Sequence, residues 1–157
     1  MSLKEEKEKL AIITAFMNYT LENDHFPKSV FKFCKDNNTE EKNFYKFFGS
    51  LDGVKGIIWE TFYKNAMSLL EKDENFEGAK PKEKLLSFYF TFFEVLLLNR
   101  SYVLFALSGS DNMMMKMGQL SSLRKMFKAF SAELIEDGNV DKPSYLQHPP
   151  KIFSAAA

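Results

Sequence analysis

Apolar side chains recur at helical spacing along most of the chain, and polar or turn-forming residues divide this pattern into segments. The pattern predicts helices over residues 3–22, 29–36, 40–48, 52–72, 81–99 and 111–136. Residues 101–107 either continue the fifth helix or kink it, and Gly118 is a candidate interruption of the last one. Beyond Gly138 the chain carries Pro143, Pro149 and Pro150, so we expect no helix there. The fold class predicted is therefore all-α.

Several boundaries of these helices have a chemical reason. Asn37 and Asn38 suit a tight helix–helix turn, because asparagine tolerates the left-handed backbone conformation. Thr39 is expected to cap the third helix and Ser50 the fourth, since a hydroxyl oxygen can accept from the free N–H groups of a first turn. Pro81 fits the first turn of the fifth helix.

The fifth predicted helix is apolar almost all round, which is typical of a helix buried on several sides. Its polar residues Ser87, Thr91 and Glu94 share one narrow stripe. This stripe either faces water or orients the head of a small apolar ligand whose tail lies against Phe88, Phe92 and Phe93. The methionines that follow are expected to fill the core, with a flexible pocket wall as the alternative; they are Met113, Met114, Met115 and Met117.

Composition narrows the class of protein. The 157 residues, 18.2 kDa, make one domain or a small reader module with a helical body. Twenty-one basic and 21 acidic residues leave the chain neutral, which argues against a strongly basic nucleic-acid coat. The 17 phenylalanines indicate either thick cores or cavities for apolar ligands.

Other features exclude several kinds of site. The longest nearly apolar run, residues 85–98, contains Glu94 and is shorter than the roughly 20 residues of a membrane-spanning helix. With no secretory signal at the start, the protein is expected to be cytoplasmic, with no membrane partner.

The single cysteine, Cys34, excludes an intramolecular disulfide and is expected in the core. We predict no metal and no cofactor. No catalytic arrangement of side chains stands out, so we expect no enzyme activity.

Residues 29–50 have the plan of a helix-turn-helix, in which the second helix enters the major groove of DNA. In this region the chain resembles the TetR family of bacterial transcriptional regulators, from Ile12 to about Val54. The resemblance is carried by Ile12-x-x-Ala15, by Ser29-Val30, and by the segment Asn43-Phe44-Tyr45-Lys46-Phe47-Phe48-Gly49-Ser50. That segment is similar to the family signature TLYxYFxSK, with Tyr45, Phe48 and Ser50 in register.

The resemblance implies an N-terminal three-helix, homeodomain-like DNA-binding unit over residues 1–50 and a helical ligand-binding and dimerisation body over residues 51–157. Asn43 would approach the bases, where an asparagine can read adenine, and Tyr45 and Lys46 would approach the DNA backbone. Lys28 and Ser29, at the start of the predicted helix over residues 29–36, are suited to a phosphate. Lys42 lies with Asn43 and Lys46 on the exposed side of the predicted helix over residues 40–48. Phe44, Phe47 and Phe48 are assigned to packing.

The chain departs from the family pattern where the recognition helix begins. Glu40 and Glu41 stand where small residues are expected, and carboxylates repel phosphates. Residues 1–50 contain eight lysines and eight acidic residues. A three-helix packing unit without a DNA partner therefore stays open as the alternative for this region.

The predicted function is a ligand-responsive transcriptional regulator that binds double-stranded operator DNA as a homodimer. Because the family usually dimerises through two C-terminal helices, either residues 111–136 suffice here or the C-terminal part is incomplete. The alternative is a lipid- or isoprenoid-binding protein on the same scaffold that does not bind DNA.

Overall fold

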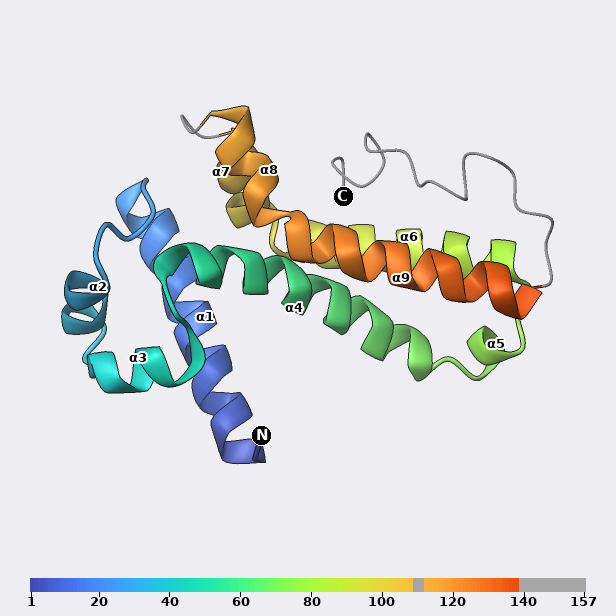
Figure 1. The fold of residues 1–157 in the computed structure, drawn as a ribbon, viewed down its shortest axis with the longest axis horizontal. Coiled ribbons are helices and arrows are strands. Elements are labelled where there is room, and N and C mark those ends of the chain that lie inside the picture. The colour runs from blue at the N-terminus through green and yellow to red at the C-terminus, as the bar shows by residue number, and fades with distance from the viewer. Residues whose placement is uncertain (109–111, 139–157) are drawn as a thin grey trace.

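The computed structural model describes residues 1–108 and 112–138, and every secondary-structure element in these ranges is a helix (Figure 1). This confirms the predicted all-α fold. The break predicted over residues 108–111 lies outside the described residues except for Ser108, which ends a helix, and the tail with Pro143, Pro149 and Pro150 lies outside them too. The helices are α1 (Leu3–Asn23), α2 (Val30–Asp36), α3 (Glu41–Phe47), α4 (Leu51–Glu71), α5 (Glu74–Glu77), α6 (Pro81–Leu98), α7 (Arg100–Ser108), α8 (Met113–Gln119) and α9 (Ser121–Gly138).

The N-terminal helices form a three-helix unit at one end of the molecule (Figure 1). α1 ends at Asn23 because Asp24 adopts a left-handed conformation, with φ of 56°. The short helices α2 and α3 pack beside α1 through Phe16, Phe33 and Phe44, whose rings meet at centroid distances of 6.0–6.2 Å. Helices of seven residues are unstable alone, so this aromatic packing is what holds α2 and α3.

The long helix α4 leads from this unit into the body, where it packs against α6 and α9. α6 and α9 run in opposite directions along the molecule (Figure 1). Their shared core is aromatic: the Phe88 ring lies 5.2 Å from Tyr63, 5.5 Å from Phe92 and 5.1 Å from Phe130. Ser50 caps α4 as predicted, its Oγ accepting from the Gly53 N–H at 3.0 Å.

The chain turns by 90° between α6 and α7, at Asn99. The Asn99 side-chain amide donates to the Val95 carbonyl at 2.9 Å and so closes the end of α6. In the described residues no single helix is long and apolar enough to cross a membrane, although α6 and α7 together satisfy that test as a bent pair.

Three predicted boundaries are wrong. Glu40, not Thr39, occupies the N-cap of α3, because the Thr39 hydroxyl donates to the Asn37 carbonyl instead. The last helical stretch breaks at Leu120, not at Gly118, since the buried side chain of Gln119 is held by other helices. The loop after α4 contains the one-turn helix α5, begun by the Asp73 carboxylate.

Two predictions about burial are also wrong. The methionines at the start of α8 are largely exposed, Met114 at 83%, and therefore do not fill the core. α6 is not buried on several sides, because α4 and α9 cover only part of its surface. Its other face presents exposed leucine and phenylalanine side chains: Leu86, Phe90, Phe93, Leu97 and Leu98.

Two contacts fix α4 to its surroundings. The Trp59 indole N–H donates to Gln119 Oε1 at 2.9 Å, and the Gln119 amide donates to the Ala106 carbonyl at 3.3 Å, which links α4, α8 and α7. Near the start of α4, the Lys55 ammonium lies 4.0 Å from the centroid of the Phe26 ring. Phe26 belongs to the loop between α1 and α2 and also meets Phe105 of α7 at 5.3 Å.

Candidate nucleic-acid interface

The turn between α2 and α3 has the tight geometry expected of a helix-turn-helix. Asn38 takes the left-handed conformation, with φ of 52°, as its residue type predicts. The Asn37 side-chain amide donates to the Phe33 carbonyl at 2.8 Å, and the Thr39 N–H donates to the Cys34 carbonyl at 2.9 Å. These bonds satisfy the last carbonyls of α2 and set the direction in which α3 leaves the turn.

The inner side of the unit is dry and well packed. Phe33, Cys34, Phe44 and Phe48 are each at most 3% exposed. Burial raises the pKa of the Cys34 thiol, and the Glu41 carboxylate adds to this effect, which suits a cysteine that acts as a small core residue. The packing of Phe44 and Phe48, and the core position of Cys34, are as predicted.

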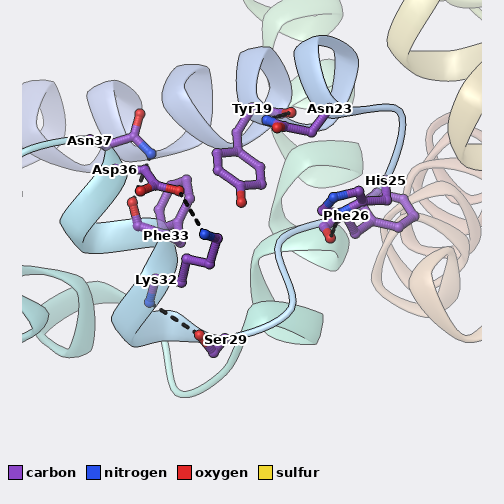
Figure 2. A network of polar contacts seen from close by, with 9 residues as sticks. All are labelled: Tyr19, Asn23, His25, Phe26, Ser29, Lys32, Phe33, Asp36 and Asn37. Carbon is purple, nitrogen blue, oxygen red and sulfur yellow. Dashed lines mark hydrogen bonds and ion pairs between the residues drawn. The ribbon is translucent and has the colours of Figure 1, made fainter.

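Lys28 and Ser29 are both exposed at the entry to α2. Figure 2 shows Ser29 at the start of this helix, beside Lys32. Ser29 Oγ accepts from the Lys32 N–H at 3.1 Å, so the hydroxyl caps the helix. Its O–H can still donate to a phosphate oxygen. One turn further, Lys32 pairs with Asp36 at 4.0 Å on the helix surface.

The residues of α3 that were predicted to contact DNA differ in their surroundings: two face water alone and two lie toward α1. Lys42 and Tyr45 are exposed, Tyr45 at 54%, and Tyr45 rests edge-on against Phe44. Asn43 is exposed too, but it borders a hollow between α3 and α1 that Glu8 also lines. Lys46 reaches α1 directly.

Lys46 is held by two carboxylates of α1. Its Nζ lies 3.4 Å from Glu5 Oε1 and 3.6 Å from Glu8 Oε2, and all three side chains remain partly exposed. The Ser2 backbone N–H, which donates to the Glu5 carboxylate, and the Lys46 ammonium together lower the pKa of Glu5. The Glu5 carboxylate therefore stays charged to lower pH, and it competes with any phosphate for Lys46.

Sequence reasoning did not find Glu5 and Glu8 as partners of Lys46. Their spacing of three residues places both on one face of α1, and that signal is present in the sequence. Which residue far along the chain faces them depends on how α1 packs against α3.

The net charge around the turn between α2 and α3 is positive, since residues 28–50 contain five lysines and three acidic residues.

The structure places the predicted ligand residues in and around the core of the body. Phe88 and Phe92 are buried and stack on each other at 5.5 Å. Ser87 and Thr91 are half-buried, and Glu94 is exposed. The two phenylalanines thus lie together in the core, while the polar stripe runs from half-buried positions to the surface.

Within residues 1–108 and 112–138, no three or more His, Cys, Asp or Glu side chains come together in a way that could hold a metal ion.

Comparisons with known proteins identify the C-terminal part of the chain. Residues 84–152 match the family model described as the tetracyclin repressor-like C-terminal domain. This part, which begins in α6, is therefore TetR-like. Neither the comparison with curated proteins nor that with solved structures finds a match.

Proposed function

We propose that the protein is a ligand-responsive transcriptional regulator that binds double-stranded operator DNA as a homodimer. The observation that carries this proposal is the α2–turn–α3 unit, whose second helix is packed on its inner side and leaves Lys42, Asn43 and Tyr45 exposed. The TetR-like match of residues 84–152 supports the same conclusion from the other end of the chain.

In the proposed complex α3 lies in the major groove. Lys28, Ser29, Lys42 and Tyr45 contact phosphates, Asn43 reads a base edge, and Lys46 reaches a phosphate when it leaves Glu5 and Glu8. The body binds a small apolar ligand, with Ser87, Phe88, Thr91, Phe92 and Glu94 as the proposed site. By this proposal the ligand tilts α4 and so changes the spacing of the two recognition helices of the homodimer. It regulates DNA binding only if its affinity differs between the two orientations of α4.

The test is a titration of the duplex upstream of the protein's own gene, followed by fluorescence anisotropy at several salt concentrations. We expect tighter binding than to an unrelated duplex of equal length, with an affinity that falls steeply as salt rises. Lys42→Ala should reduce the slope of log affinity against log salt by about two units, because the homodimer loses one phosphate contact from each protomer.

The matched control is Lys125→Ala, an exposed lysine on α9, which should leave the slope unchanged. Asn43→Ala should weaken binding to the specific duplex by about 1–3 kcal/mol and leave binding to the unrelated duplex as it was. Equal, salt-independent affinity for both duplexes would contradict the proposal.

A second candidate is a lipid- or isoprenoid-binding protein on this scaffold without a DNA partner. The ion pairs of Lys46 with Glu5 and Glu8 favour it, as do the exposed carboxylates of Glu40 and Glu41 where α3 begins. Organic extraction of the purified protein followed by mass spectrometry tests it: a bound lipid in a protein that binds no DNA would favour this candidate.

A further inference from the structure

α2 presents an exposed phenylalanine beside the proposed phosphate contacts. Phe31 is 64% exposed, whereas Phe33, two residues further along the same helix, is 2% exposed and packs against Phe16. A single exposed apolar side chain is ordinary on a protein surface, so its exposure alone is not evidence of a contact. Phe31 is distinguished by the charges around it and by its place in the helix-turn-helix.

The side of α2 that carries Phe31 is basic. Lys28 precedes Phe31 by three residues and Lys35 follows it by four, and this spacing places both lysines on the side of the helix where the ring lies. Both lysines are exposed, and residues 28–35 contain three lysines and no acidic residue. Double-stranded DNA is complementary to such a surface, because it offers phosphates to the lysines and apolar carbon atoms to the ring.

The second helix of the unit has the same arrangement. Tyr45 on α3 is 54% exposed and follows the exposed Lys42 by three residues, as Phe31 follows Lys28. Among the phenylalanines and tyrosines of residues 1–50, all of which the structure describes, Phe31 and Tyr45 are the two exposed rings. Each helix of the helix-turn-helix therefore presents one ring beside one lysine. When such a unit binds DNA, its first helix crosses the backbone of the duplex.

We propose that Phe31 is a further DNA-contacting residue, whose ring packs against an apolar group of the duplex between phosphates that Lys28 and Lys35 hold. The apolar group is a deoxyribose of the backbone or the C5-methyl group of a thymine at the edge of the major groove. This inference rests on the proposed operator binding and adds to it a contact that is not electrostatic.

The contacts of the ring and of the lysines depend on salt in different ways. A lysine that binds a phosphate releases counterions, so its removal changes the slope of log affinity against log salt. A ring that leaves water releases none, so its removal lowers the affinity by the same factor at every salt concentration. The salt dependence therefore separates the contribution of Phe31 from that of Lys28.

Fluorescence anisotropy with the duplex upstream of the protein's own gene, at several salt concentrations, tests the proposal. Phe31→Ala should weaken binding about tenfold at every salt concentration and leave the slope unchanged. Lys28→Ala should instead reduce the slope by about two units, one for each protomer. Phe31→Leu, which keeps a large apolar side chain, should lose less than about threefold.

The matched control is Phe90→Ala, since Phe90 is a 73% exposed phenylalanine of α6 and lies outside the three-helix unit. It should bind the duplex as the unaltered protein does. Because Phe31 is exposed, urea unfolding of Phe31→Ala should be close to that of the unaltered protein, so a loss of affinity reflects the contact and not the fold.

A second duplex, in which uracil replaces every thymine, distinguishes the two apolar groups. If the ring lies on a thymine methyl group, this duplex should weaken the unaltered protein more than Phe31→Ala, because only the unaltered protein has that contact to lose. If the ring lies on a deoxyribose, the replacement should weaken both proteins by the same factor.

Equal affinity of Phe31→Ala and the unaltered protein for the operator would overturn the proposal, as would an equal loss in Phe90→Ala or a changed salt slope in Phe31→Ala. If Phe31→Ala bound DNA normally but no longer bound vesicles of phosphatidylglycerol, the surface would belong to a lipid partner instead. An unaltered protein with no affinity for DNA would contradict the proposed function and this inference together, whereas normal DNA binding by Phe31→Ala contradicts the Phe31 contact alone.

Discussion

The Lys46 ammonium cannot pair with the carboxylates of α1 and contact a DNA phosphate, as proposed, at the same time. Its ammonium lies 3.4 Å from Glu5 and 3.6 Å from Glu8, and it also lies 5.3 Å from the Phe47 ring. These contacts tie α3 to α1 and stabilise the three-helix unit. The same contacts occupy one of the cations of α3 that DNA would attract if α3 binds it as proposed.

We expect Glu8→Gln to tighten DNA binding at low salt by up to about fivefold, because it removes one competitor for Lys46 in a partly exposed ion pair. Fluorescence anisotropy with a fixed duplex measures this change. Glu6→Gln is the matched control, since Glu6 is an exposed neighbour on α1 that changes the net charge equally but is not among the carboxylates paired with Lys46. An equal gain for Glu6→Gln would show that net charge alone is responsible.

At the scale of the helices, the sequence predicts the ends of helices where the residue type at the boundary determines the backbone conformation or the cap. The left-handed Asn38, the Ser50 cap and the proline at the first turn of α6 follow from residue type and were predictable. The N-cap of α3 was not predictable, because Thr39 and Glu40 compete for it and the choice depends on the path of the turn. The exposed apolar face of α6 was not predictable either, because helical periodicity does not say which apolar face of a helix lacks a neighbour.

The burial of Gln119 at the junction of α4, α7 and α8 could not be predicted from the sequence either. Gln119 looks like a surface residue in the sequence, yet it is 8% exposed and joins Trp59 to the Ala106 carbonyl. An amide can accept with its oxygen and donate with its nitrogen, so it satisfies two buried groups at once.

We expect Gln119→Leu to lower the free energy of unfolding by about 2–4 kcal/mol, because it leaves a buried indole N–H and a buried carbonyl without their partner. Urea unfolding followed by circular dichroism measures this. Combining Gln119→Leu with Trp59→Phe should cost less than the sum of the single changes, since the orphaned N–H is then absent. Strict additivity would argue against the hydrogen bond as the cause.

At the scale of the whole molecule, Phe26 connects the three-helix unit with the body. Its ring lies 6.0 Å from Phe16 of α1 and 5.3 Å from Phe105 of α7, with the Lys55 ammonium of α4 over its face. A movement of α4 or α7 in the body therefore has a direct contact through which it can displace the helices of the proposed DNA interface.

We expect Phe26→Ala to lower the free energy of unfolding by about 2–3 kcal/mol, somewhat less than truncation of a fully buried phenylalanine. Phe31→Ala, at an exposed position, should change it by less than about 0.5 kcal/mol. Urea unfolding of both variants makes the comparison. If the two variants were equally stable, Phe26 would not be the link between the two parts.

The buried side chains form one cluster that continues from Ile12 and Phe16 through Val54 and Ile58 into the body. The parts on either side of the predicted division at residue 50 therefore share one core. A chimera that exchanges residues 1–50 for the N-terminal unit of another protein must carry the first turns of α4 with it. The incoming loop must also fit against α7, where Phe105 meets Phe26 here. Without those turns, the incoming unit would lack the part of the shared core that Val54 and Ile58 supply.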